Sequence, residues 1–364
     1  MKTPSVPGWL GRPRFDYPLL AALVILSLLG LLVLFSASDG NQRLVMNQAI
    51  RVGIGFVALL GFSLVPPRIF QSWSPWLYLL GLLLLLATVW LGEGRGANRW
   101  LDLGLLRFQP SEIMKLMVPM AVAAWLHSRL LPPDLKAAAV ALAIIAIPMF
   151  LIVSQPDLGT ALLVGMSGIL VIFLAGLRWR AILATLGLSV AVAPVFWLFM
   201  HEYQRNRVRT FLNPEADPLG QGWNIIQSKI AVGSGGLSGK GWMQGSQSQL
   251  EFIPEHTTDF ILAVFAEEFG LVGVLLLLAL YLFIIGRSLY LATQTRDTFS
   301  RLLCGSLALI FFVYVMVNAG MVTGLLPVVG VPLPLVSYGG TSIVTLLAGF
   351  GLIMSAWSHR KFIR

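Results

Sequence analysis

Ten apolar runs recur along the chain, and each is close to the ~20 residues that an α-helix needs to cross a bilayer. In residue numbers, the runs are 17–36, 47–65, 75–92, 110–127, 137–153, 160–177, 181–200, 260–286, 302–325 and 340–358. Only 11% of the residues are charged, whereas about 25% is usual for a soluble domain. The sequence therefore predicts an all-α polytopic membrane protein, with about ten transmembrane helices in one membrane domain that covers residues 1–364.

The first apolar run follows Lys2, Arg12 and Arg14, which is the arrangement found in a secretory signal peptide. The run is longer than the apolar core of such a peptide, and many more runs follow it. We therefore expect an uncleaved first transmembrane helix.

Basic residues predict the orientation of the helices, because cytoplasmic loops of membrane proteins carry an excess of Lys and Arg. With a cytoplasmic N-terminus, that side receives most of the basic residues, and the short loops opposite receive only Arg43, Arg51, Arg95, Arg99 and Arg107. Both termini are then cytoplasmic, and residues 201–259 form a long extracytoplasmic loop between the seventh and eighth helices. The net charge of +9 follows from this bias and does not call for a nucleic acid partner.

The polar, glycine-rich stretch from Gly233 to Asp259 interrupts this apolar pattern. Irregular polar backbone cannot face lipid, so the stretch lies in water or lines a wet cavity. Five acids crowd its end within eighteen residues: Glu251, Glu255, Asp259, Glu267 and Glu268. Asp259 is the candidate catalytic carboxylate, and the alternative is that it or Thr258 caps the following helix. The sequence offers no Cys-based metal site, since Cys304 is the only cysteine.

Charged residues also occur at the ends of two other predicted helices. Glu112 and Lys115 share one helix face, and an ionisable pair at this depth is either a functional group in a cavity or a self-neutralising pair. Asp157, in the turn SQPDLGT, either caps the next helix or contacts substrate or a cation.

Further candidates for binding an anionic substrate lie in two loops. Arg205, Arg207 and Arg209 would share one side of an extended segment and could bind a diphosphate there, whereas a helix would spread them; contact with lipid headgroups is the alternative. Lys229 and Lys240 flank a glycine-rich segment that is not a P-loop, because the pattern requires Gly at position 234 and Ser or Thr at position 241. In the Pro- and Gly-rich loop 327–342, Ser337 and Tyr338 offer hydroxyl groups.

Six segments in this order resemble the SEDS family (shape, elongation, division and sporulation) of bacterial peptidoglycan polymerases. They are QPSEIMK, QPDLGT, the RxRV-to-DPLGQGW stretch, QSKIAVGSGGLSGKGW, LEFIPEHTTDFILAVFAEE and PLPLVSYGGTS. The resemblance covers nearly the whole chain, and GKGWMQGSQSQLEFIPE, AVFAEEFGLVG and VPPRIF are more similar to the elongation branch than to the division branch. The sequence departs from the family in having His256–Thr257–Thr258–Asp259, where a basic or polar residue often precedes His-Thr-Asp.

The resemblance implies ten spans, a long extracytoplasmic loop, and glycosyl transfer from lipid II in the bacterial cytoplasmic membrane. It implies Asp259 as the catalytic carboxylate and places Glu112 and Lys115 in a central cavity. It also implies a partner, a class B penicillin-binding protein, among other membrane proteins of the elongation complex. The expected reaction inverts the anomeric carbon, builds β-1,4 glycan strands for lateral wall growth and releases undecaprenyl diphosphate.

The chemistry expected at Asp259 is removal of the acceptor proton, or coordination of a divalent cation, Mg²⁺ or Mn²⁺. The residues expected to bind substrate are Glu112, Lys115, Asp157, Arg205, Arg207, Arg209, Lys229, Lys240, Ser337 and Tyr338. A flippase or transporter of lipid-linked precursors is the alternative function, although a transporter would concentrate its polar residues at the bilayer midplane rather than in an outer loop. A non-catalytic scaffold would leave the acid cluster unexplained.

Overall fold

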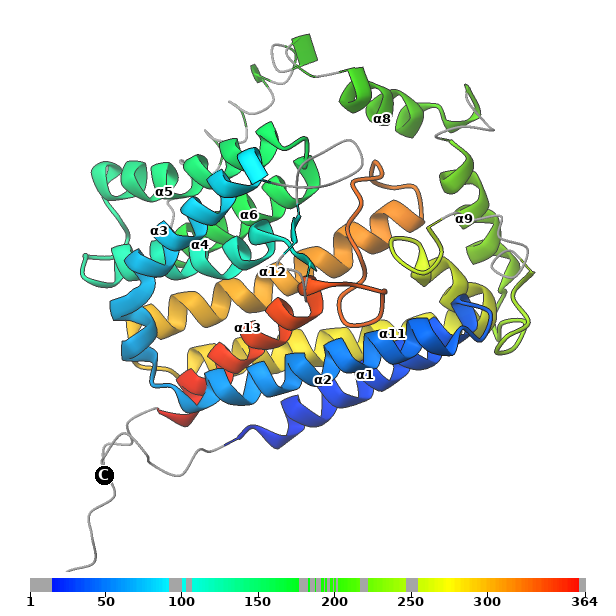
Figure 1. The fold of residues 1–364 in the computed structure, drawn as a ribbon, viewed down its shortest axis with the longest axis horizontal. Coiled ribbons are helices and arrows are strands. Elements are labelled where there is room, and N and C mark those ends of the chain that lie inside the picture. The colour runs from blue at the N-terminus through cyan, green and yellow to red at the C-terminus, as the bar shows by residue number, and fades with distance from the viewer. Residues whose placement is uncertain are drawn as a thin grey trace, which may run out of the picture.

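The computed structural model describes residues 15–91, 100–102, 107–176, 202–216, 222–246 and 255–359, with a few isolated positions between 183 and 200. These residues form a bundle of long helices (Figure 1). The helices are α1 (Tyr17–Ala37), α2 (Gln42–Leu64), α3 (Pro67–Leu91), α4 (Pro110–His127), α5 (Leu135–Ser154), α6 (Leu158–Leu174), α8 (Glu202–Leu212), α9 (Trp223–Ser234), α11 (Ile261–Thr293), α12 (Thr298–Val322) and α13 (Thr341–Ser358). The two-residue strands β1 (Leu101–Asp102) and β2 (Arg107–Phe108) pair in an antiparallel manner, and a short 3-10 helix covers Pro214–Ala216.

The apolar runs predict these helices well. Nine of the ten runs coincide with α1 to α6 and α11 to α13, and the run 181–200 lies largely outside the described residues. Seven of the described helices are long and apolar enough to cross a membrane, and α6 is a shorter apolar helix. The prediction of a helical membrane protein with several transmembrane helices is therefore confirmed.

α12 lies in the middle of the bundle, between α4 and α6 on one side and α11 and α13 on the other (Figure 1). Its buried face includes Phe311 and Tyr314, which are among the largest fully buried side chains. α2 packs along α13 at small residues, since a Cβ on Gly55 or on Gly351 would overlap the neighbouring helix. Small residues at such crossings allow two helices to approach closely without a large apolar driving force.

α8, α9 and the start of α11, which Asp259 precedes by two residues, lie toward one end of the bundle, and the end of α13 lies at the other (Figure 1). We call the first the Asp259 end and the second the Arg68 end, after the residue near the start of α3. The loop that follows α12 turns back into the bundle at the Asp259 end. Gln48 and Arg51 of α2 hold the carbonyls of Ser337 and Gly339 there, with donor–acceptor distances of 2.9 and 3.3 Å.

α11 is broken at Gly270, where φ is 64° and ψ is −166°, a conformation that is open essentially to glycine alone. The break separates the amide groups of residues 271 and 272 from the carbonyls of residues 267 and 268, their partners in a regular helix. Four backbone hydrogen bonds of 2.9 to 3.1 Å to the glycine-rich segment replace them: Lys240 N to Glu267 O, Gly241 N to Glu268 O, Leu271 N to Gly236 O, and Val272 N to Leu237 O. The glycine-rich segment thus satisfies the interrupted helix at depth in the bundle, where unpaired backbone is costly.

Replacing Gly270 with alanine is expected to lower the free energy of unfolding by about 1–3 kcal/mol or more. The added Cβ would overlap the backbone of Gly239 and Leu237, and the positive φ adds strain. Thermal unfolding of the purified protein measures the effect. Gly233→Ala is the matched control, because a Cβ there meets nothing within 4 Å and alanine favours the helix. Equal melting temperatures for the two variants would contradict this account of the break.

Candidate active site

Asp259 lies in the turn 255–260 that leads into α11. The capping alternative is not realised, because Phe260 is the N-cap of α11 and no side chain caps that helix. The hydroxyl of Thr258 donates instead to Glu255 Oε2 at 2.7 Å. Among the described residues, the carboxylate of Asp259 makes no hydrogen bond or ion pair. It is therefore available to a ligand or a substrate.

Hydrogen bonds from one residue of α12 and from two residues of the loop after it fix the backbone around Asp259. Asn318 of α12 donates from Nδ2 to the carbonyls of both Asp259 and Val331, at 2.8 Å each. Tyr338 N donates to the Thr257 carbonyl at 2.9 Å, and the Ser337 hydroxyl donates to the Thr258 carbonyl. Because catalytic groups need fixed positions, this packing of the re-entrant loop onto the turn suits a reactive carboxylate.

Burial raises the pKa of Asp259 from 3.8 to about 6. Desolvation is the largest cause, since a carboxylate is less stable as an anion when it is removed from water. The nearby charge of Glu255 raises the pKa further, and the positive charge of Arg207 partly opposes both effects. A carboxylate with this pKa is a stronger base than an ordinary aspartate and is still largely ionised at neutral pH.

Arg207 lies on α8 and lines a cavity of about 230 Å³ together with Thr210, Asn224, Ile225 and Val328. Its guanidinium makes no hydrogen bond or ion pair with other described residues, and its charge acts on Asp259. Such a cation beside a cavity and a carboxylate is suited to bind a phosphate or diphosphate group.

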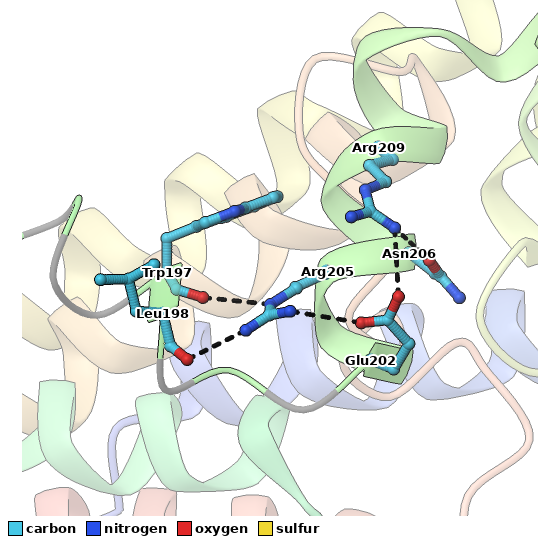
Figure 2. A network of polar contacts seen from close by, with 6 residues as sticks. All are labelled: Trp197, Leu198, Glu202, Arg205, Asn206 and Arg209. Atoms are coloured by element: carbon cyan, nitrogen blue, oxygen red, sulfur yellow. Dashed lines mark hydrogen bonds and ion pairs between the residues drawn. The ribbon is translucent and has the colours of Figure 1, made fainter.

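Arg205 and Arg209 do not line the cavity beside Arg207. The segment is helical rather than extended, so the three arginines spread around α8 as the helical alternative predicts. Figure 2 shows Arg205 and Arg209 directed toward Glu202, with N–O distances of 3.5 and 3.3 Å. Arg205 also donates to the carbonyls of Trp197 and Leu198. A single anion-binding cluster of all three arginines is therefore not formed in this structure.

The two candidate lysines lie apart from Asp259 as well. Lys240 Nζ is 2.6 Å from Glu267 Oε1 and 2.9 Å from Ser246 Oγ, so its charge is balanced by a buried acid. Lys229 is exposed on α9, with its amino group beside Gly324 at the end of α12, where a cation is favoured by the helix dipole. The structure thus gives Lys240 an internal partner and Lys229 a position at a helix end.

Two acids of the cluster around Asp259, Glu267 and Glu268, also have partners inside the protein. Glu267 pairs with Lys240, and Glu268 accepts a hydrogen bond from Ser36 of α1. Both glutamates are buried, and their partners meet the expectation that carboxylates at this depth are paired. Glu251 lies outside the described residues.

Glu112 and Lys115 form a buried pair on α4, at an Nζ–Oε1 distance of 2.6 Å and with side chains only 8% and 9% exposed. Lys115 Nζ lies 5.0 Å from the centre of the Tyr314 ring on α12, and Glu112 Oε2 has no hydrogen-bond partner. Tyr314 is one helical turn from Asn318, or about 6 Å along the axis at 1.5 Å per residue. α12 thus links the buried pair to the turn that carries Asp259.

Asp157 caps α6, as the capping alternative predicts, since its Oδ1 accepts from Thr160 N at 3.2 Å. Its Oδ2 accepts from Gln109 Nε2, also at 3.2 Å, which ties the start of α6 to the start of α4. The cap does not exclude a contact with substrate.

Ser337 and Tyr338 differ in availability. The Ser337 hydroxyl accepts from Leu333 N and donates to Thr258 O, and the residue is buried, so it holds the loop rather than facing a ligand. The Tyr338 ring stacks under the Arg51 guanidinium at 4.7 Å. Sequence reasoning did not single out Gln48, Arg51, Tyr314 and Asn318, although a polar residue inside an apolar run is a signal that could have found them.

Comparisons with known proteins agree with this architecture. The profile of the FtsW, RodA and SpoVE family, described as cell cycle proteins, matches residues 17–362. The chain is 50% identical to the peptidoglycan glycosyltransferase MrdB of Escherichia coli K12, over 99% of this chain and 98% of that protein. It is 35% identical to the probable peptidoglycan glycosyltransferase FtsW of Trichlorobacter lovleyi, over 94% and 93% of the two chains.

Solved structures extend the similarity to three dimensions. A chain from a peptidoglycan synthase complex that coordinates polymerization and crosslinking matches with a TM-score of 0.84 at 35% identity, over 95% of this chain and 98% of that one. The rod shape determining protein RodA of Thermus thermophilus matches with a TM-score of 0.73 at 30% identity, over 98% and 100%. By its sequence profile, its relatives and its fold, this chain belongs to the FtsW/RodA/SpoVE family, on the RodA side.

Proposed function

We infer that this chain is a peptidoglycan glycosyltransferase of the rod-elongation type, which joins lipid II units into β-1,4 glycan strands. Asp259 carries the inference: its carboxylate has no partner within the part of the chain that the structure describes, its pKa is raised to about 6, and it stands in a firmly held turn. The 50% identity to a peptidoglycan glycosyltransferase over nearly the full chain supports the same reaction.

In the proposed step, Asp259 takes the proton of the acceptor sugar hydroxyl as that oxygen attacks the anomeric carbon of the donor. One C–O bond forms to the acceptor, and the bond from the anomeric carbon to the lipid diphosphate breaks. A single displacement inverts the anomeric centre, so an α-linked donor gives a β-linked product. The diphosphate leaves with the electron pair of the broken bond, and Arg207 neutralises part of its charge.

The residues around Asp259 would also suit a Mg²⁺ or Mn²⁺ ion. Mg²⁺ often binds one or two carboxylates together with substrate phosphates, and Asp259 and Glu255 would supply the carboxylates here. No group of three potential His, Cys, Asp or Glu ligands occurs among the described residues, so the substrate would complete the set. When bound, such an ion offsets diphosphate charge and lowers the pKa of a coordinated hydroxyl.

The other candidate residues would act around this centre. Lys115, through its contact with Tyr314, and its partner Glu112 would line the bundle interior, and Asp157 and Tyr338, which are only partly buried, would contact substrate at the loop ends. Arg205, Arg209, Lys229, Lys240 and Ser337 hold the surrounding segments, and direct contact with substrate would require those that are paired to leave their partners.

The proposed setting is the bacterial cytoplasmic membrane, with ten spans, both termini in the cytoplasm and residues 201–259 outside. The acceptor and donor would then reach Asp259 from the outer leaflet. A class B penicillin-binding protein would be the partner that cross-links the product, together with other membrane proteins of the elongation complex. The similarity to a chain of a peptidoglycan synthase complex supports such a partnership.

Adding lipid II to the purified protein in detergent tests the function. A polymerase forms glycan strands under these conditions, whereas a flippase or transporter has no membrane to move lipid across. The assay is run with and without a class B penicillin-binding protein, and with and without a chelator, which tests the cation. Absence of polymer in every arm, with lipid II translocation in vesicles, would favour the transporter instead.

The pH dependence of polymerisation is expected to show an acidic limb near pH 6, where Asp259 gains its proton. Glu255→Gln removes a repulsive charge, so the pKa falls and the limb moves to lower pH. Arg207→Gln removes an attractive charge, so the limb moves to higher pH, and the Michaelis constant for lipid II rises if Arg207 binds the diphosphate. Initial rates from pH 5 to 8 measure both. Identical limbs in all three proteins would show that another group titrates.

A further inference from the structure

A cavity of about 690 Å³ lies at the Arg68 end of the bundle, away from Asp259. α3, α4 and α5 supply its walls, and Asp297, just before α12, lies at its rim. The volume is within the ~300–1,000 Å³ typical of ligand sites. None of the residues assigned above to the glycosyltransferase lines it.

The wall that α3 contributes is one continuous stripe: Arg68, Gln71, Ser72, Ser74, Pro75 and Tyr78. From Arg68 to Tyr78, this stripe covers about 15 Å at 1.5 Å per residue. The hydrocarbon core of a bilayer is ~30 Å thick, so the cavity reaches from one membrane surface to about the middle. That depth equals one leaflet.

The deep half of the cavity is apolar and offers no free hydrogen-bonding group from its side chains. Ala121, Ala124 and Ile144 line it, and the hydroxyl of Tyr78 is already bonded to the Ile144 carbonyl at 2.8 Å. Pro148 explains that bond, because proline has no N–H to pair with the carbonyl four residues earlier. Water needs two to four polar partners, so the deep half favours a hydrocarbon chain.

The rim of the cavity carries a free positive charge. Asp297 Oδ2 accepts from both N and Oγ of Ser300, and Asp297 Oδ1 lies 3.4 Å from His127 Nδ1. Arg68 is exposed at the start of α3, and its guanidinium has no hydrogen-bond or ion-pair partner among the described residues. An anionic group at the rim would meet the guanidinium of Arg68 without competing for it.

We propose that this cavity binds a membrane lipid with an anionic phosphate headgroup, with the phosphate at Arg68 and one chain along α3, α4 and α5. Basic pockets between transmembrane helices recognise anionic lipid headgroups in this way. The site lies in the leaflet opposite to the Asp259 end. It does not depend on the glycosyltransferase activity.

Native mass spectrometry of the full chain tests the proposal by titration with phosphatidylglycerol, phosphatidylethanolamine and undecaprenyl phosphate. Phosphate-headed anionic lipid is expected to bind more tightly than phosphatidylethanolamine. Arg68→Gln should weaken that binding about tenfold, the usual effect of losing a charge-assisted contact, and Ala124→Phe should remove it by filling the floor. Arg301→Gln, an exposed arginine at the same end but outside the cavity, is the matched control and should leave it unchanged.

The outcomes separate the sources of the phosphate. Tighter binding of undecaprenyl phosphate assigns the site to the carrier lipid, and tighter binding of phosphatidylglycerol assigns it to bulk phospholipid. Equal binding in wild type, Arg68→Gln and Arg301→Gln overturns the proposal, as does an equal loss in both arginine variants. Because Arg68 is exposed, its variant keeps the test valid even if Ala124→Phe fails to fold.

Discussion

Asp259→Asn is expected to abolish polymerisation of lipid II while the protein stays folded. Asparagine keeps the shape of the side chain but cannot accept the acceptor proton, and loss of a general base typically costs ~10²–10⁴-fold in rate. Strand synthesis by the purified variant, with the partner protein present, measures the effect. Glu215→Gln is the matched control, because it removes an exposed acid of the 3-10 helix that is not assigned to the site and should retain activity at neutral pH. Wild-type rates for Asp259→Asn would remove the catalytic role.

The same substitution is expected to leave the melting temperature unchanged or raised at neutral pH. The folded pKa of Asp259, about 6, lies above the ordinary value of 3.8, so the folded protein holds this proton more tightly than the unfolded chain does. Stability from this group is therefore complete below pH 3.8 and is lost as the pH rises toward 6. The amide avoids that loss. A lower melting temperature at pH 7.5 would mean that the carboxylate supports the fold.

Lys115→Met is expected to destabilise the protein by about 3–5 kcal/mol, the usual cost of leaving one partner of a buried ion pair alone. Glu112 would be left without its cation in the bundle interior, with Oε2 already lacking a hydrogen-bond partner. Thermal unfolding and yield in detergent measure the loss.

The double variant Glu112→Gln with Lys115→Met provides the control for this second prediction. It removes both charges, and replacement of a whole buried pair is often neutral. The double variant should therefore melt above Lys115→Met, even though one more residue is changed. If it melts at the same temperature or below, the pair is not the source of the destabilisation.

The helices were largely predictable from the sequence, because length and apolarity alone decide which segments can lie in a bilayer. Glu112 and Lys115 were predictable as a pair, since three residues separate them on one helix. Asp157 was predictable as a cap. These are local relations, and each depends on neighbours within one turn of the chain.

Contacts between distant segments were not predictable in this way. The alternating arginines fit either an extended or a helical segment. Only the fold shows that Arg205 and Arg209 turn to Glu202, while Arg207 has no such partner among the described residues. Lys240 was expected at a diphosphate, yet its partner is Glu267, twenty-seven residues later. Asn318 reaches Asp259 across fifty-nine residues, and no spacing in a single sequence specifies such a pair.

The order in which the chain is synthesised gives the break in α11 a further meaning. The glycine-rich segment that completes the interrupted helix precedes α11, so it has already emerged from the ribosome when α11 enters the membrane, and the break can be sealed at once. The backbone around Asp259 depends instead on α12 and on the loop after it, which are translated later. The nascent protein therefore gains a sealed helix before it gains a positioned carboxylate, and a chain that stops before Asn318 would insert without becoming competent for catalysis.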